Sequence, residues 1–132
     1  WGMFQNRSGE VVKRFHVAMT GTWQGDVGTL DERFTYSDGS TERRVWTLRR
    51  QADGSWRGTA GDVVGEAIGE VSGNALHWRY QLLLKVDGEQ YVVDFDDWMF
   101  LMDQRVMLNR ARMSKWGIDL GQVTLSFYKP AK

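Results

Sequence analysis

Residues 75–102 read ALHWRYQLLLKVDGEQYVVDFDDWMFLM, and this stretch decides the fold. Asp87 and Gly88 form a pair typical of a two-residue turn, and both flanking segments are rich in apolar, β-branched and aromatic residues. Such a turn predicts a β-hairpin, in which directly opposed residues share one face of the strand pair. On the apolar face this register pairs Leu84 with Tyr91, Leu82 with Val93, Tyr80 with Phe95, Trp78 with Asp97 and Leu76 with Met99.

Similar turn pairs recur at Asp38-Gly39, Asp53-Gly54 and Gly73-Asn74. Together they predict strands over residues 10–20, 23–36, 41–51, 55–63, 65–72, 75–86, 89–102, 105–114 and 119–129, although residues 104–116 also fit a helix. An antiparallel meander of this length leaves exposed strand edges unless it closes on itself. We therefore predict an all-β fold, an antiparallel up-and-down meander closed into a small lipocalin-like β-barrel of about eight to ten strands.

Asp96 and Asp97 lie between aromatic residues in this strand pattern. Because successive side chains of a strand face opposite ways, one of the two carboxylates must face the interior, and the hairpin register selects Asp97. A two-residue turn at Asp103-Gln104 would place Arg110 opposite Asp97. A buried carboxylate is costly unless it is paired, so an inward arginine fits this position.

The same reasoning applies to the hairpin around Ser37-Asp38-Gly39. A three-residue loop with Gly39 in a left-handed conformation places Glu32 opposite Arg44 and Leu30 opposite Trp46. Two hairpins thus predict two inward acid and arginine pairs. They either lock strand register as structural ion pairs, lie in solvent because the register slips by one residue, or serve a site as polar anchors or an acid/base pair.

Small residues are predicted to face large ones in the middle of the chain. A turn at Gly73-Asn74 places Val71 opposite Leu76, Gly69 opposite Trp78, Ala67 opposite Tyr80 and Gly65 opposite Leu82. Glycines at such positions leave room for aromatic side chains inside a barrel.

Length and composition narrow the possible functions. The 132 residues predict one domain over residues 1–132. Seventeen basic and seventeen acidic residues are interleaved, which argues against nucleic acid as a partner. The chain has no cysteine, and its two histidines, His16 and His77, lie far apart in sequence, so neither a metal nor another cofactor is expected.

The outer surface carries one unusual feature. The register assigns Trp98, Phe100, Met102 and Met107 to the outward face, where they are either covered by the N-terminal segment or form a contact surface. His77 also faces outward, opposite Glu70, which predicts a solvated ion pair.

Several stretches together resemble one bacterial lipoprotein family, catalogued as domain of unknown function 3833. The residues that carry the resemblance are Leu30–Gly39, Arg44-Val45-Trp46, Gly61–Ala67, Gly73-Asn74-Ala75-Leu76, Phe95-Asp96-Asp97-Trp98-Met99, Asn109-Arg110-Ala111 and Lys115-Trp116-Gly117. Members typically carry a signal peptide and a lipobox cysteine. The resemblance therefore implies a lipid-anchored protein on the periplasmic side of the bacterial cell envelope, and the start at Trp1 without a methionine leads us to expect that the signal and anchor segment was removed.

The sequence thus favours a barrel that binds an apolar or amphipathic, lipid-like small molecule and associates with the membrane only through the removed anchor; it does not predict an oligomeric state. The candidate ligand-binding residues are Glu32, Arg44, Trp46, Trp78, Tyr80, Leu82, Phe95, Asp97, Met99 and Arg110, the charged ones orienting a head group and the others lining an apolar wall. One alternative is a small barrel enzyme that uses Asp97 or Glu32 as a general acid or base. Another is a structural or assembly module of the envelope that uses the outward aromatic surface.

Overall fold

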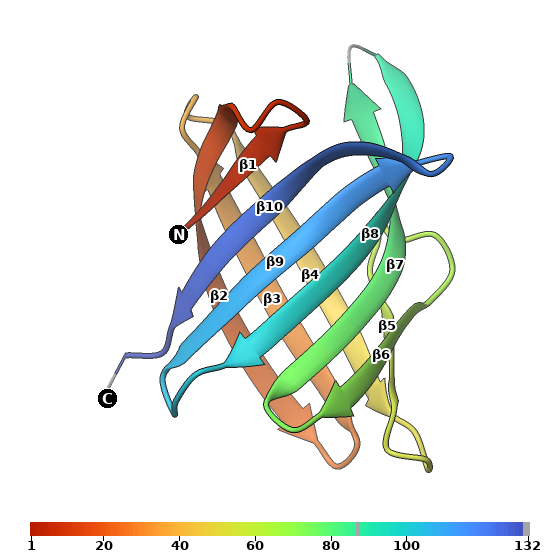
Figure 1. Cartoon of the computed structure of the whole chain (residues 1–132). Coiled ribbons are helices and arrows are strands. Elements are labelled where there is room, and N and C mark those ends of the chain that lie inside the picture. The colour runs from red at the N-terminus through yellow and green to blue at the C-terminus, as the bar shows by residue number, and fades with distance from the viewer. Residues whose placement is uncertain (87, 131–132) are drawn as a thin grey trace.

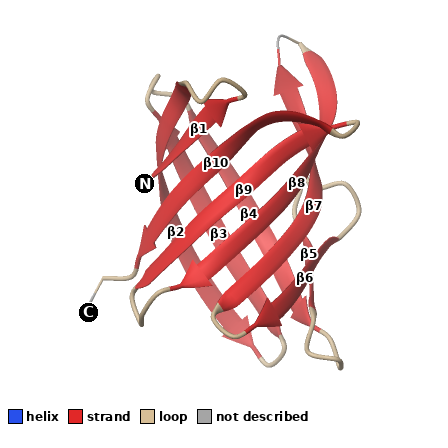
Figure 2. Ribbon diagram, viewed as in Figure 1, coloured by secondary structure: helices blue, strands red, loops and turns tan. Residues whose placement is uncertain are grey.

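A computed structural model describes residues 1–86 and 88–130, and these residues form ten β-strands. The strands are β1 (Gly2–Asn6), β2 (Val11–Gln24), β3 (Val27–Tyr36), β4 (Thr41–Arg50), β5 (Trp56–Thr59), β6 (Ala67–Ser72), β7 (Ala75–Val86), β8 (Glu89–Leu101), β9 (Val106–Lys115) and β10 (Ile118–Tyr128). Each pairs antiparallel with its neighbours in sequence, and β1 also pairs with β10, so the sheet closes into a barrel (Figures 1 and 2). The predicted all-β barrel is confirmed. No helix of membrane-spanning length and hydropathy occurs among the described residues.

The central hairpin has the predicted register. Strands β7 and β8 pair Trp78 with Asp97 and Tyr80 with Phe95, as well as Leu82 with Val93. Of the predicted turn residues, Asp87 lies outside the described residues, and Gly88 has a positive φ of 79°.

The β3–β4 hairpin is also confirmed, since Glu32 pairs with Arg44 and Leu30 with Trp46. Gly39 adopts a φ of 86°, and its N–H donates to the carbonyl of Tyr36. A positive φ is accessible to glycine without a steric penalty, so this residue fixes the three-residue loop and with it the register of the hairpin.

The predicted register of β8 and β9 is wrong by one residue. Asp97 pairs with Ala111, while Arg110 pairs with Trp98 on the outer face. The cause lies in the turn, where the Asp103 carboxylate accepts hydrogen bonds from the N–H groups of Arg105 and Val106. These bonds stabilise a loop one residue longer than the predicted two-residue turn, and a shift of one residue moves every side chain of β9 to the other face. Residues 106–115 are a strand, so the helix alternative for 104–116 is also wrong.

The strand boundaries in the N-terminal part of the chain differ from the prediction, at β1 and at the end of β2. Strand β1 was not predicted, because no Asp-Gly or Asn-Gly pair marks its end; instead Asn6 accepts hydrogen bonds from the N–H groups of Ser8 and Glu10. Strand β2 continues to Gln24, past the expected end at residue 20, and the chain turns at Gly25 with a φ of 60°.

Strands β5 and β6 are shorter than predicted, and residues 60–66 form a connection that crosses the wall of the barrel between β4 and β7. In this connection Val63, and not Gly65 as predicted, pairs with Leu82. The N–H of Leu83 donates to the carbonyl of Asp62. The pairing of Gly69 with Trp78 is as predicted, and a Cβ on Gly69 would lie 2.3 Å from the indole. That glycine therefore makes the room that the Trp78 ring occupies.

Two apolar clusters fill part of the interior. One contains the buried residues Leu82, Val93, Phe95, Ala111 and Met113, and the other contains Trp46, Ala67 and Trp78. Between them lies a set of polar side chains.

Candidate functional site

A layer of polar side chains, which we call the polar layer, crosses the interior of the barrel. Its members come from five strands and one loop, which are β3, β4, β7, β8, β9 and the connection between β5 and β6; they are Glu32, Arg44, Tyr80, Asp97, Asn109 and Asp62. All of these strands lie in one closed sheet, so side chains far apart in sequence converge inside it. The layer divides into two halves.

In the first half, the Arg44 guanidinium is held by two carboxylates. It bonds Asp62 through Nε, at 3.0 and 3.1 Å, and through Nη2 at 2.8 Å, and Nη1 lies 3.9 Å from Glu32 Oε1. The Trp46 indole N–H donates to Glu32 at 3.2 Å. Burial opposes the charged form of Arg44, yet the bonds and charge of Asp62, together with the charge of Glu32, raise its pKa. Burial also raises the pKa of Glu32, although Arg44 and Trp46 act against it. The first half is thus a compensated, charge-assisted network.

In the second half, Asp97 is 4% exposed and relies on neutral donors. Its carboxylate accepts a hydrogen bond from the Tyr80 hydroxyl at 3.2 Å and another from the Asn109 amide, which also donates to the Trp98 carbonyl at 3.1 Å. Among the described residues, no salt bridge reaches Asp97. Burial raises the pKa of Asp97 to about 7, and the negative charges of Glu32 and Asp96 contribute to this rise. The two hydrogen bonds act in the opposite direction and lower it. This carboxyl group therefore gains and loses a proton near neutral pH.

The polar layer is reached from outside through a groove of about 800 Å³ in the wall. Arg44 and Asp62 line it, together with Lys13, Tyr36 and Glu42. Burial and the bond to Glu42 raise the pKa of Tyr36, so its hydroxyl remains a donor. The groove lies where β5 and β6 are too short to fill the sheet between β4 and β7.

Toward the opposite end of the barrel, at the bottom of Figure 1, strand β2 is exposed to solvent on both of its faces. Met19 and Trp23 lie on the same face of β2 as the buried Phe15, yet they are 38% and 53% exposed. Every residue of β2 from Ala18 to Gln24 is exposed, whichever face it lies on. The inward side chains of Met19 and Trp23 are therefore accessible to solvent.

The structure places nine of the ten predicted ligand-binding residues on the inner face. Trp46, Trp78, Leu82 and Phe95 belong to the two buried clusters, Tyr80 and Met99 pack against them, and Glu32, Arg44 and Asp97 belong to the polar layer. Arg110 is exposed on the outer face, because the register of β9 is shifted by one residue, and the predicted Asp97–Arg110 pair does not form.

Sequence reasoning missed two members of the polar layer. Asn109 directly precedes Arg110 and occupies the inward position that was predicted for Arg110. The signal that could have revealed this one-residue shift is Asp103, whose carboxylate accepts a hydrogen bond from the N–H of Arg105 in the turn. Asp62 lies in the connection between two short strands, and a strand pattern carries no information about the direction of a loop side chain.

On the outer face, Trp98 and Phe100 are exposed as predicted, but Met107 lies on the same face of β9 as the buried Asn109. His77 pairs in register with Glu70, yet its Nε2 contacts Asp96 at 2.6 Å and its ring stacks on Trp98 at 4.0 Å. Glu70 instead accepts a hydrogen bond from Arg79. The imidazole therefore contacts a different carboxylate, that of Asp96, from the one expected.

Comparison with known proteins gives one match. A family described as protein of unknown function (DUF3833) matches residues 1–129. The chain belongs to the DUF3833 family. No curated protein and no solved structure gives a significant match. The family match covers all ten strands and therefore the whole polar layer, and it assigns no activity to either.

Proposed function

We propose that the DUF3833 barrel binds an apolar or amphipathic small molecule in its lumen and does so at the bacterial cell envelope. The observation that carries the proposal is the combination of Asp97, a buried carboxyl group without a salt bridge among the described residues, with inward apolar side chains that remain exposed at one end. A site with apolar walls and a few convergent polar groups, one of them with a perturbed pKa, is typical of ligand pockets.

The charges of the polar layer support a particular kind of head group. The polar layer contains three carboxyl groups, from Glu32, Asp62 and Asp97, and one guanidinium, that of Arg44, which contacts Asp62 and Glu32. This excess of acceptors favours a hydroxyl, amide or amine group over a free carboxylate or phosphate. Trp46, Met99 and Leu30 then offer an apolar wall next to that head group.

The experiment is a fluorescence titration with N-phenyl-1-naphthylamine, a neutral apolar probe. The wild-type protein should bind it saturably, and Met19→Trp should weaken binding at least tenfold because Met19 faces the lower lumen. Ala18→Trp is the matched control, since its side chain lies next to Met19 but on the outer face. Unfolding midpoints measured for both variants establish that the fold is intact. Absence of saturable binding to the wild type, or equal binding by both variants, contradicts the proposal.

One observation favours the alternative that the barrel is an enzyme: the pKa of Asp97 is about 7. A carboxyl group that titrates near neutral pH can act as a general acid or base. If the barrel turns over a bound substrate, Asp97→Asn should lower kcat by about two to four orders of magnitude. If the barrel only binds its ligand, the same substitution should change Kd modestly, and the wild type should show no turnover.

The envelope location rests on the family resemblance and is tested separately. Fractionation of cells that express the full-length precursor should recover the protein with the membranes, and removal of the upstream anchor segment should release it. Recovery in the cytosolic fraction contradicts the location without affecting the lumen proposal.

A further inference from the structure

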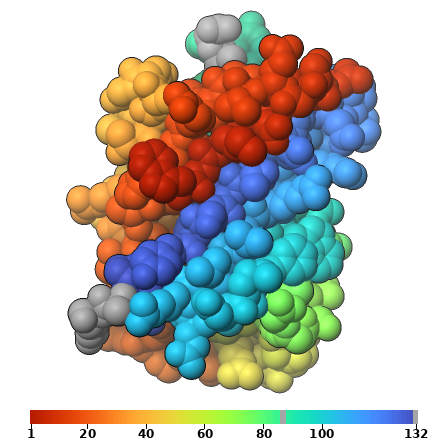
Figure 3. Space-filling model, turned by 60° about the vertical axis from the view of Figure 1, so that its left-hand side comes forward, coloured from red at the N-terminus to blue at the C-terminus, as the bar shows by residue number. Residues whose placement is uncertain are grey.

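A second groove, which we call the outer groove, lies in the wall of the barrel where β1 is inserted between β2 and β10, and both outward residues and the inward residues Phe15, Tyr36 and Asn109 line it. Its volume is about 860 Å³, within the range of small-molecule pockets of roughly 300–1,000 Å³. Figure 3 views this wall, where the red N-terminal residues lie against the blue residues of β9 and β10. The outer groove is a different surface from the groove between β4 and β7, because the two share only Tyr36 among their lining residues.

The walls of the outer groove are apolar. Trp1 is hydrogen-bonded through its backbone to Ser126 and packs against His16, with ring centroids 4.8 Å apart. Phe100 and Leu108 are directly paired on β8 and β9 and form the facing wall. The small residue Ser126 pairs with Leu108 and lies between the two apolar walls.

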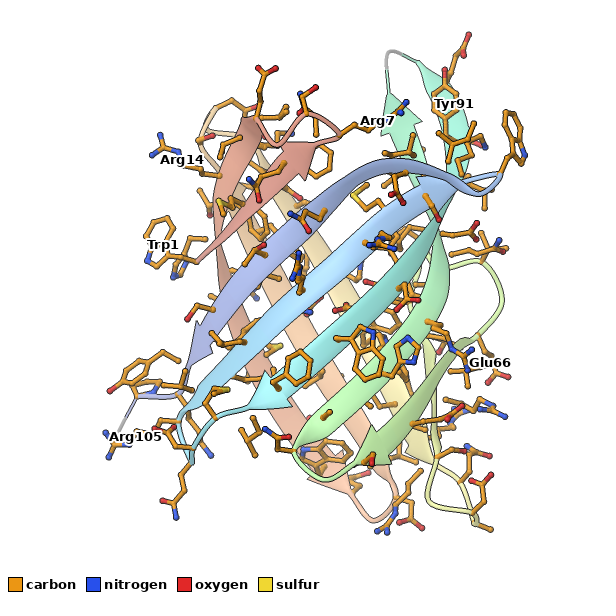
Figure 4. All side chains as sticks on the ribbon, in the orientation of Figure 1. Trp1, Arg7, Arg14, Glu66, Tyr91 and Arg105 are labelled. Carbon is orange, nitrogen blue, oxygen red and sulfur yellow. The ribbon has the colours of Figure 1, made fainter. Side chains whose placement is uncertain are left out.

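The charges of the outer groove are all positive. Arg110 pairs with Thr124, Thr124 with Met3, and Met3 with Arg14, so both arginines lie on one line across four strands, about 14 Å apart at the backbone. Neither arginine forms a salt bridge among the described residues, and no described Asp or Glu lines the groove. Figure 4 shows Trp1 and Arg14 projecting from this wall on the left of the barrel.

We propose that the outer groove binds an anionic amphiphile, whose acyl chain lies between Trp1 and the Phe100–Leu108 wall and whose carboxylate or phosphate head pairs with Arg14 and Arg110. An arginine fork matches the geometry of such head groups, and the apolar walls supply area that an inorganic anion does not use. The site differs in charge from the proposed lumen site, in which carboxylates predominate, although Asn109 of the polar layer also lines the outer groove.

The test is calorimetric titration with dodecyl phosphate below its micellar concentration. Dodecyl phosphate should bind at least tenfold more tightly than dodecyltrimethylammonium, which has the same chain and the opposite charge. The double variant Arg14→Gln/Arg110→Gln should weaken binding of dodecyl phosphate at least tenfold. The matched control Arg33→Gln/Arg112→Gln removes two exposed arginines outside the groove and should leave the affinity unchanged.

A second readout locates the ligand. In a ¹H–¹⁵N spectrum, dodecyl phosphate should shift the indole signal of Trp1, assigned with Trp1→Phe, and leave that of Trp46, which donates to Glu32, in place. Met19→Trp should have no effect on the affinity. Equal affinity for the two detergents, unchanged binding by the arginine double variant, loss of binding in Met19→Trp, or binding only to phosphatidylglycerol vesicles would each overturn the proposal.

Discussion

Glu32 and Asp97 are two inward carboxyl groups of the same barrel, and they are accommodated in different ways. Glu32 lies next to Arg44 and the Trp46 indole, so burial is opposed by a cation. Among the described residues, Asp97 is bonded only by the neutral groups of Tyr80 and Asn109, so burial prevails and its pKa rises to about 7. The difference is that a cation offsets part of the cost of burial at Glu32, whereas neutral donors leave the pKa of Asp97 near neutral pH.

The largest expected effect on stability comes from the first half of the polar layer, in which two carboxylates hold the Arg44 guanidinium. Arg44→Met leaves the carboxylates of Glu32 and Asp62 without their cation, and breaking a buried pair in this way costs about 3–5 kcal/mol of unfolding free energy. Chemical denaturation measures the loss. The neighbouring exposed residue offers a control, since Arg43→Met removes only a surface pair with Asp31 and should barely move the denaturation midpoint. Equal midpoints for the two variants would mean that Arg44 is not a buried partner.

The next effect compares two adjacent carboxylates. Asp97→Ala removes the acceptor of the Tyr80 hydroxyl and one of the two acceptors of the Asn109 amide, at a cost of about 2–3 kcal/mol. Asp96→Ala removes an exposed contact with His77 and should cost about 0–1 kcal/mol. This order follows from the inward position that the hairpin register predicts for Asp97, although its predicted partner Arg110 lies on the outer face. Denaturation midpoints that coincide for the two variants would place Asp97 on the surface.

The last effect is a dependence of stability on pH, which is the smallest of the three when it is expressed per pH unit. Between about pH 4, the pKa of an aspartate in an unfolded chain, and the folded-state pKa of about 7, the folded protein holds the Asp97 proton and the unfolded chain does not. The free energy of unfolding should therefore fall as pH rises through this window, by up to about 1.4 kcal/mol per pH unit. Because other groups also titrate, the informative quantity is the difference between the wild type and Asp97→Asn. The variant should gain stability relative to the wild type from pH 5 to pH 8, whereas Asp96→Asn should run parallel to the wild type.

Particular elements explain how far the sequence predicts this molecule. The β3–β4 and β7–β8 registers were predictable because Gly39 and the Asp87-Gly88 pair encode the length of their loops, and register follows from loop length. The β8–β9 register was not predictable in this way, because hydrogen bonds to the Asp103 carboxylate stabilise a longer loop. Glu32, Arg44 and Asp97 were therefore found, and Asn109 was missed by one position.

The remaining gaps have a different origin. Strand β1 is short and gains its stability from pairing with both β2 and β10, which is a tertiary effect that no local pattern contains. The outer groove depends on the same pairing, because it brings Arg14 of β2 and Arg110 of β9 onto one line. Closure of the barrel, rather than any sequence motif, creates that site.

The most direct test of the polar layer as a ligand site is an NMR titration of the Asp97 side-chain carbonyl carbon, assigned with Asp97→Asn, in the presence and absence of N-phenyl-1-naphthylamine. A buried carboxyl group that faces the ligand should titrate with a midpoint near pH 7 in the free protein, and the midpoint should move when the probe occupies the lumen. A midpoint near pH 4, or one that is unchanged by saturating probe, would contradict the account.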